Sequence, residues 1–191
     1  MKGLSLWQPW ATLIAIGEKR IETRSWGTAY RGELLICATA STPAEGWSVL
    51  GDPGFFKVLP KAGYPNRISF PQGGALALAY LADVRQIASA GQWGYSYRRN
   101  GDKVHQPWET LFDYEFGNYG EGRYAWHLAD IRPLPNPYKC RGGQGLWMVP
   151  QETQRAVYQA LNMTAEEIEV FGADPDKPAI GSLFESMEAI P

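Results

Sequence analysis

The chain has few of the residues that build metal centres or disulfide frameworks. Its 191 residues include two cysteines, Cys37 and Cys140, and two histidines, His105 and His127. Two thiols cannot form a disulfide framework or a four-ligand zinc site, and two histidines do not complete a dedicated metal site. We therefore expect no metal and no cofactor, and we expect both cysteines to be reduced thiols.

Long apolar runs are also absent. No stretch approaches the about 18 apolar residues that a membrane-spanning helix needs. The first residues, Met-Lys-Gly-Leu-Ser-Leu-Trp-Gln-Pro, contain no apolar stretch that ends in small residues, so no signal peptide is expected. Hydrophobic residues make up 45% and charged residues 20%, the balance of a chain that buries a core. These features argue against secreted, membrane and disordered classes, and we expect a cytoplasmic protein.

The chain as a whole has no excess of positive charge, because its net charge is −2. The charges are, however, unevenly distributed along the sequence. Residues 1–150 contain 16 Lys and Arg against 12 Asp and Glu, whereas residues 151–191 contain 2 against 8. A mildly basic body therefore precedes an acidic tail. The tail is either a solvated surface or a segment that lies away from, or competes with, an anionic ligand of the body.

Aromatic residues are abundant, with 8 Trp, 10 Tyr and 7 Phe, and 21 Gly and 14 Pro supply many turns. This composition favours short strands, barrels and loops over a helical bundle. Hydrophobic periodicity and turn residues predict a helix over 10–16, a helix near 44–50, and strands over 20–26, 33–39, 74–87, 123–134 and 144–149. The strand over 33–39 is apolar on both faces and is expected to be central, and prolines 133, 135 and 137 are expected to end the strand before them.

Two stretches lack this periodicity. Residues 41–72 are punctuated by Pro, Gly and Ser, and residues 88–120 form an aromatic, polar loop region that is too long for a bare connection. We treat 88–120 as an insertion with a functional role. Beyond 150 we expect a helix over 152–161 and a second one capped by Thr164 and Glu167. The prediction is an α+β fold, a small mixed β-barrel domain over 1–150 with flanking helices, followed by an acidic helical extension over 151–191.

The densest polar cluster runs from Gly17 to Arg24. The end of the first helix brings in Lys19, and strand alternation places Glu22 and Arg24 on one face. Lys and Arg can hold an anion, and a carboxylate can accept hydrogen bonds from a planar base. Six rings are candidates for stacking on such a base: Trp7, Trp10, Trp26, Tyr30, Trp126 and Trp147. The alternative is a surface ion pair beside tryptophans of the core.

The segment Gly17-x-Lys19-x-x-Glu22-x-Arg24 matches the Gly-x-Lys-x-x-Glu-x-Arg signature of the ASCH family (activating signal cointegrator homology). Its surroundings resemble the family too, in this order: Ser5-Leu6-Trp7-Gln8-Pro9-Trp10-Ala11, Tyr30-Arg31-Gly32, Gly122 to Trp126, and Gly142 to Trp147. The resemblance covers roughly residues 3–150, and it implies a PUA-like β-barrel with helices at its rim. One fold hosts several functions, so no single activity follows.

Nucleic-acid binding is the first function that the resemblance implies. The partner would be RNA, another single strand, or a free nucleoside or nucleotide, and no membrane is implied. Four cationic side chains would contact phosphate: Lys19, Arg24, Arg31 and Arg141. Three side chains would form hydrogen bonds with a base edge: Gln8, Glu22 and Gln144. Stacking would use the rings named above, among them Trp10, Trp26, Tyr30, Trp126 and Trp147.

Hydrolysis is the second function. Small ASCH-like amidohydrolases of N4-acetylcytidine use a Lys, a Thr nucleophile in the motif and a distant Glu. This chain keeps the lysine as Lys19, but Glu22 takes the nucleophile's place, and Thr23 is expected to point to the opposite face. In a variant mechanism Glu22 would act as general base, with Lys19 lowering its pKa or holding an oxyanion. Ribonuclease activity is also known among ASCH-like proteins, but no acidic metal cluster in this sequence supports it, and we favour binding over catalysis.

Three other features are weaker candidates. His127 lies in an aromatic strand, where a packed histidine is expected. Cys37 is expected to be a small hydrophobe, and Cys140, between Lys139 and Arg141, has neighbours that favour a thiolate but no base beside it. Residues 93–99 alternate aromatic and Arg residues, which suits either a nucleic-acid-contacting flap or a surface loop.

Overall fold

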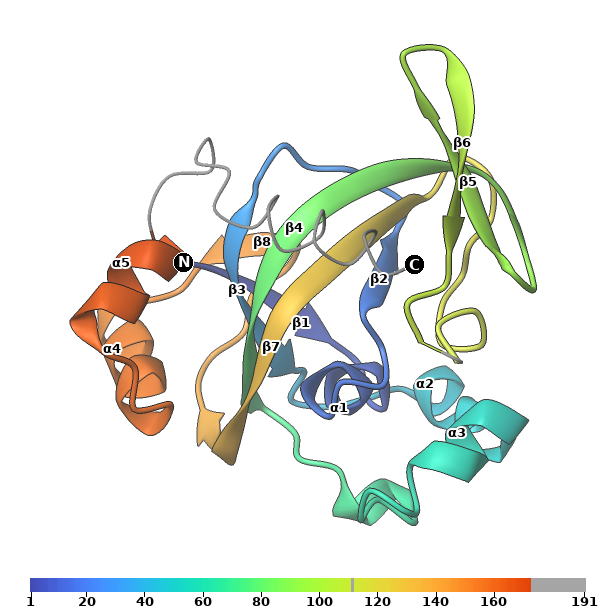
Figure 1. Cartoon of the computed structure of the whole chain (residues 1–191). Coiled ribbons are helices and arrows are strands. Elements are labelled where there is room, and N and C mark those ends of the chain that lie inside the picture. The colour runs from blue at the N-terminus through green and yellow to red at the C-terminus, as the bar shows by residue number, and fades with distance from the viewer. Residues whose placement is uncertain (111, 173–191) are drawn as a thin grey trace, which may run out of the picture.

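The computed structural model describes residues 1–110 and 112–172, which form one mixed β-sheet with helices on both of its faces (Figure 1). The strands are β1 (Lys2–Leu6), β2 (Ile21–Arg24), β3 (Gly32–Ala38), β4 (Gly74–Gly91), β5 (Gly94–Arg99), β6 (Asp102–Pro107), β7 (Tyr124–Lys139) and β8 (Leu146–Met148). The α-helices are α1 (Trp10–Ala15), α2 (Ala44–Ser48), α3 (Pro53–Val58), α4 (Gln151–Ala160) and α5 (Ala165–Gly172), with short 3₁₀ turns η1 (Val49–Gly51) and η2 (Arg67–Ser69).

The strands follow the order β2-β7-β4-β3-β1-β8, and β5 pairs with both β4 and β6. Strands β1 and β3 are parallel, and the other pairs are antiparallel. The hydrogen-bonded path ends at β2 and β8, so the sheet is not closed. The expected α+β fold with a mixed sheet and flanking helices is confirmed, but the sheet does not close into the expected barrel. In the described part of the chain no helix is long and apolar enough to cross a membrane.

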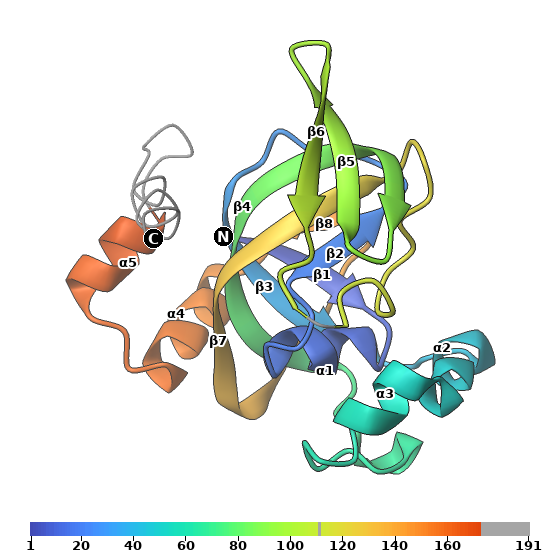
Figure 2. The same ribbon diagram turned by 45° about the vertical axis from the view of Figure 1, so that its right-hand side comes forward.

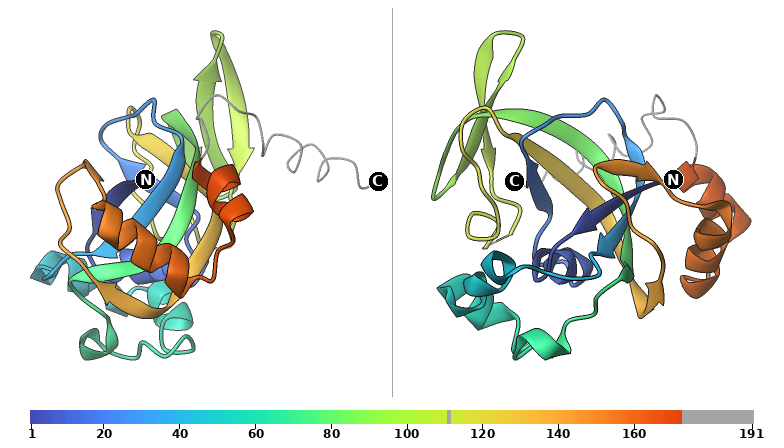
Figure 3. Two further views of the ribbon diagram at one scale, coloured as in Figure 1. Left: turned by 90° about the vertical axis from the view of Figure 1, so that its left-hand side faces the viewer. Right: turned by 180° about the vertical axis from the view of Figure 1, so that it is seen from behind.

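Strand β3 is central, as its sequence predicts. Leu34 and Ile36 belong to a buried cluster with α1, whereas Leu35 and Cys37 belong to a second cluster on the opposite face. Val157 of α4 is part of that second cluster, so α4 shares the core of the sheet. Figure 3 shows α4 and α5 on one side of the sheet and α1 on the other. An apolar run with alternating side-chain directions can fill both layers at once.

Strand β7 is longer than predicted, because its prolines do not end it. Ala77 of β4 pairs with Pro133 and Ala75 pairs with Tyr138, so residues 134–137 lie in a bulge between these two pairs. Proline has no N–H to donate and is tolerated at such irregular positions. The strand therefore continues to Lys139, where sequence analysis ended it at 134.

The region 88–120 is not the loop that the sequence suggested. Strand β4 continues to Gly91, and β5 and β6 form a hairpin that projects beyond the sheet (Figure 2). Tyr95 and Tyr97 of β5 pack into a buried cluster with Ile87 of β4. The hairpin could not be recognised in the polar, arginine-rich sequence. Its side chains are buried only at the strand ends nearest the sheet, so the strands show no continuous alternation of apolar and polar residues.

Strand β1 was not predicted, and α3 lies in the stretch 41–72, which shows no clear periodicity. The predicted cap of α5 is confirmed: the Thr164 N–H donates to Glu167 Oε2 over 2.8 Å, and the Glu167 N–H donates to Thr164 Oγ1 over 3.2 Å. The boundary at 150 between a domain and an acidic extension stays a prediction. Residues 173–191 of that extension lie outside the described residues.

Candidate nucleic-acid-binding pocket

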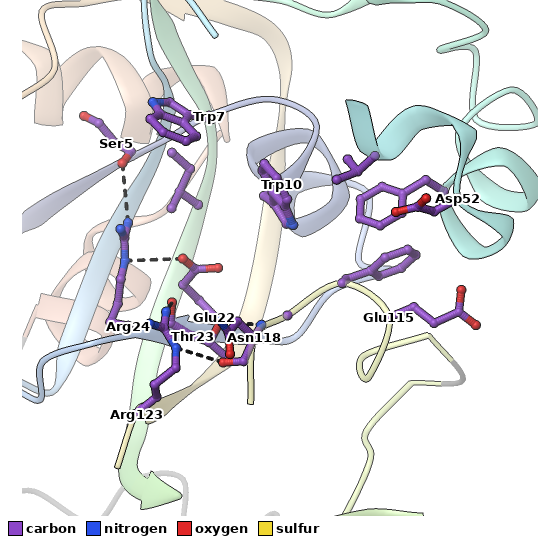
Figure 4. A pocket seen from close by; sticks show the side chains of 15 residues that line it. Ser5, Trp7, Trp10, Glu22, Thr23, Arg24, Asp52, Glu115, Asn118 and Arg123 are labelled. Atoms are coloured by element: carbon purple, nitrogen blue, oxygen red, sulfur yellow. Dashed lines mark hydrogen bonds and ion pairs between the residues drawn. The ribbon is translucent and has the colours of Figure 1, made fainter. Parts of the chain in front are cut away.

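A pocket of about 480 Å³ opens between β2, α1, the η1–α3 segment and residues 115–118 (Figure 4). Its lining comes from six parts of the chain: Ser5, Leu6, Trp7, Trp10, Glu22, Thr23, Arg24, Val49, Asp52, Phe55, Glu115, Phe116, Gly117, Asn118 and Arg123. The polar motif on β2 therefore faces a concave, partly aromatic surface. This arrangement matches the composition of a small-ligand site, in which apolar walls surround a few convergent polar groups.

The carboxylate of Glu22 is held between two cations. Lys19 Nζ lies 3.4 Å from Glu22 Oε2, and Arg24 Nε lies 3.3 Å from Glu22 Oε1. Glu22 and Arg24 both line the pocket, as strand alternation predicts for residues two apart. Thr23, which was expected to point to the opposite face, is part of the lining as well. A carboxylate whose two oxygens each face a fixed cation has a defined orientation, which is what recognition of a planar partner requires.

Lys19 lies behind the pocket rather than in it. Its side chain is 0% exposed, and Nζ donates a hydrogen bond to the Ile21 carbonyl over 2.5 Å. Burial lowers the pKa of Lys19, while the carboxylates of Glu22 and Asp113 act in the opposite direction. The prediction that Lys19 meets a ligand phosphate is therefore wrong, because no surface of its ammonium is open. Its role in the fold is to fix the Glu22 carboxylate from below.

Aromatic rings form the wall opposite β2. Trp10 meets Phe55 edge to face, with ring centroids 6.1 Å apart, and Phe55 meets Phe116 in the same way at 4.8 Å. Trp7 lies at the mouth of the pocket and is 48% exposed. The buried contacts hold Trp10 and Phe55 in place, and the exposed face of Trp7 is open to a partner.

The rim of the pocket is polar. Arg24 Nη2 donates to the Ser5 carbonyl over 3.5 Å, and Arg123 Nε donates to the Asn118 carbonyl over 3.0 Å. The Thr23 hydroxyl oxygen accepts a hydrogen bond from the Asn118 N–H over 3.1 Å. Thr23 thus ties β2 to the inserted segment. Three carboxylates and two guanidinium groups line the pocket, from Glu22, Asp52 and Glu115 and from Arg24 and Arg123, so the pocket is not a basic polyphosphate site.

Several residues that the sequence placed in the cleft belong to the packing of the fold. Gln8 is fully buried, its Nε2 donates to the Pro71 carbonyl over 2.6 Å, and its Oε1 accepts from the Thr12 N–H over 3.1 Å. Trp126 is also fully buried, and it meets Trp26 edge to face with centroids 4.7 Å apart. Neither Gln8 nor these two indoles lines the pocket.

The remaining candidates also lie outside the pocket. The Tyr30 hydroxyl donates to the Glu33 carbonyl over 2.6 Å, and Arg31 Nη2 lies 3.1 Å from Asp83 Oδ1. Trp147 packs over Gly3 of β1, where a Cβ would lie 2.4 Å from the indole ring. Arg141 and Gln144 are exposed on the loop between β7 and β8. Their side chains are not part of the pocket lining, and the functions predicted for them are unsupported by its geometry.

His127 is packed, as expected. It is nearly buried, its Nδ1 lies 2.5 Å from Glu109 Oε1, and its Nε2 is hydrogen-bonded to the Tyr95 hydroxyl. Within residues 1–110 and 112–172, no three His, Cys, Asp or Glu side chains come together in a way that could hold a metal ion.

Most of the wall that faces β2 could not be predicted from the sequence. Asp52 and Phe55 come from the stretch 41–72, and Glu115, Phe116 and Asn118 come from the stretch 88–120. Neither stretch has the periodicity that would have placed its side chains. The one usable signal was the unusual length of both stretches, which is typical of functional loops.

Comparison with known proteins identifies the family of the chain. The chain is 56% identical over 41 residues to activating signal cointegrator 1 of Homo sapiens, and 54% identical over 41 residues to that of Mus musculus. The match covers 22% of this chain and 7% of the length of each relative. A crystal structure of ASCH from Zymomonas mobilis is 20% identical, with 82% of this chain and 92% of that chain covered, and its TM-score is 0.43. The ASCH domain model matches residues 4–137, and the chain therefore belongs to the ASCH family.

Proposed function

We propose that the protein binds single-stranded RNA and takes one unstacked base into the pocket between β2 and α3. The observation that carries this proposal is the Glu22 carboxylate, which is fixed between Lys19 and Arg24 and faces a pocket with Trp7 and Trp10 in its lining. A carboxylate accepts hydrogen bonds from the N–H groups of a base edge. Family membership supports the same class of partner, because the ASCH family is broadly associated with RNA binding.

The energies are compatible with this binding mode. Taking a base out of a stack costs a few kcal/mol, least where the strand is already single. Stacking on an aromatic side chain returns about 1–3 kcal/mol per base. Trp7 offers an exposed face at the mouth, and Trp10 and Phe55 line the pocket interior. Double-stranded RNA cannot present a base in this way, so the proposal is specific to single strands.

The charges of the pocket favour a base over a phosphate chain. Asp52 and Glu115 line the wall opposite Arg24, where they would repel a polyphosphate. Arg24 and Arg123 lie at the β2 side and are the cations placed to meet the phosphates that flank the inserted base. One base with one or two flanking phosphates therefore fits the charge distribution best.

Replacing Trp7 by Ala tests the proposal. We expect Trp7→Ala to weaken binding of a fluorescently labelled single-stranded RNA about 5- to 100-fold, because one base loses its stacking partner. The matched control is Met148→Ala, which removes an apolar side chain that is 63% exposed on the edge strand β8 and is not part of the pocket lining. Fluorescence anisotropy measures both. Equal affinities of the two variants, or no RNA binding by the unchanged protein, would overturn the proposal.

The geometry favours binding over hydrolysis of an acylated nucleoside. The Lys19 ammonium is enclosed and already donates to the Ile21 carbonyl, and the Thr23 hydroxyl accepts the Asn118 N–H. The Lys19 ammonium is therefore out of reach of a ligand, and the Thr23 hydroxyl is engaged with the inserted segment. We expect no release of cytidine when the pure protein is incubated at high concentration with N4-acetylcytidine and sampled by liquid chromatography. Cytidine production that disappears in Glu22→Gln would instead make Glu22 a general base and replace our proposal.

A further inference from the structure

The two cysteines of the chain lie next to each other, although 103 residues separate them. Cys37 Sγ is 3.9 Å from Cys140 Sγ. Cys37 lies on central strand β3 and is buried, whereas Cys140 follows the last residue of β7 and is partly exposed. Neither residue lines the base pocket, so the chemistry of this thiol pair is independent of the proposed RNA binding.

The sheet explains how they meet. Cys37 pairs with Ala75 of β4, and Ala75 pairs on its other side with Tyr138 of β7. Strands two positions apart in a sheet are about 10 Å apart, which is too far for their side chains to bond. Cys140 lies just beyond β7, and its sulfur also has a hydrogen bond with the Ala75 backbone. The chain after Lys139 therefore brings Cys140 past the Ala75 backbone to within reach of Cys37.

The two thiols are chemically unequal. The hydrogen bond from Cys37 lowers the pKa of Cys140 to about 7, and the same contact together with burial raises the pKa of Cys37. The thiolate is the reactive form of a cysteine, and Cys140 is also the one that solvent reaches. An accessible thiolate beside a buried thiol is the arrangement of a redox-sensor pair, in which Cys140 would be the attacking cysteine and Cys37 the resolving cysteine.

We propose that Cys140 and Cys37 form an oxidation site for hydroperoxides that closes to a reversible disulfide. The Cys140 thiolate attacks one peroxide oxygen, the O–O bond breaks, and the leaving hydroxide or alkoxide is protonated to water or alcohol. Cys140 is then a sulfenic acid. The sulfur of Cys37 attacks the Cys140 sulfur, the S–O bond breaks, and the thiol proton leaves with the hydroxyl group as water. The two thiols have together lost two electrons to the peroxide, and a dithiol reductant converts the disulfide back to two thiols.

The experiment treats the full folded chain with a small excess of hydrogen peroxide and analyses it by intact mass and by peptide mapping without reduction. We expect both thiols to disappear together, a mass loss of about 2 Da from the two thiol hydrogens, and one cross-linked peptide pair that contains both cysteines. Dithiothreitol is expected to restore the original mass. The same protein in denaturant is the control, and it should form this cross-link more slowly because the sulfurs are no longer held together.

Two variants separate the roles of the thiols. Cys140→Ser is expected to leave Cys37 unoxidised, because a buried thiol with a raised pKa does not react. Cys37→Ala is expected to leave Cys140 as a sulfenic acid that dimedone traps, since the resolving thiol is gone. Oxidation of wild-type Cys140 to sulfinic acid with Cys37 still free would overturn the proposal. So would a cross-link between two molecules, or two thiols that stay reduced at peroxide concentrations that oxidise free cysteine.

Discussion

Glu22→Gln is expected to lose RNA binding and to lower the free energy of unfolding by about 3–5 kcal/mol, since it leaves a buried ammonium without its partner. The Lys19 side chain is fully enclosed, and Glu22 Oε2 lies 3.4 Å from its Nζ. The amide has no charge to offset the ammonium, and its NH₂ group cannot accept a hydrogen bond from a base. Urea titration followed by tryptophan fluorescence gives the stability, and anisotropy with labelled RNA gives the affinity.

The double variant Lys19→Met/Glu22→Gln separates these two effects. Removing the ammonium as well should restore most of the lost stability, because replacing a buried ion pair by an apolar side chain is often neutral. RNA binding should stay lost, because the carboxylate is still missing. Glu121→Gln, at an exposed position, is the control for the change of charge and should alter neither quantity. A double variant that binds RNA as tightly as the unchanged protein would contradict the role assigned to Glu22.

Most of the sheet could be predicted from the sequence, because periodicity reports burial. The run Leu34 to Ala38 is apolar at every position, and it fills both layers of the core. The hairpin of β5 and β6 could not be predicted, because exposed residues such as Arg98 and Arg99 carry no such pattern. The prolines of β7 misled the prediction, since a bulge lets them stay within a strand.

Only the β2 side of the candidate site was predicted from the sequence. The motif pointed to Glu22 and Arg24, and strand alternation placed both on the face that lines the pocket. The depth of Lys19 could not be predicted, because a lysine at the end of a helix is usually solvated and its burial here depends on distant residues such as Asp113. Trp26 and Trp126 were predicted as stacking faces, but large rings in a Trp-rich chain are mostly core.

A buried carboxylate, Asp113, helps to hold the inserted segment to the motif. Asp113 is fully buried, its Oδ1 accepts the Arg20 N–H over 3.1 Å, and its Oδ2 accepts the Thr110 N–H over 2.8 Å. Burial raises the pKa of Asp113, and the two backbone N–H groups and Lys19 oppose that rise. These contacts connect the start of β2 to the segment that supplies Phe116 and Asn118 to the pocket. The insertion is thus built into the site rather than attached beside it.

Asp113→Ala is therefore expected to lower the free energy of unfolding by about 3–6 kcal/mol, since hydrogen bonds to a charged group are worth about 1.5–3 kcal/mol each and two are lost. RNA affinity should fall as well, because residues 115–118 form one wall of the pocket. Urea titration and anisotropy measure the two effects, and limited proteolysis should cut first between 112 and 119. Asp102→Ala, at the exposed tip of the hairpin, is the matched control and should change neither quantity. If Asp113→Ala lost stability while RNA affinity and the first proteolytic cut stayed the same, the insertion would be a structural support and not a wall of the binding site.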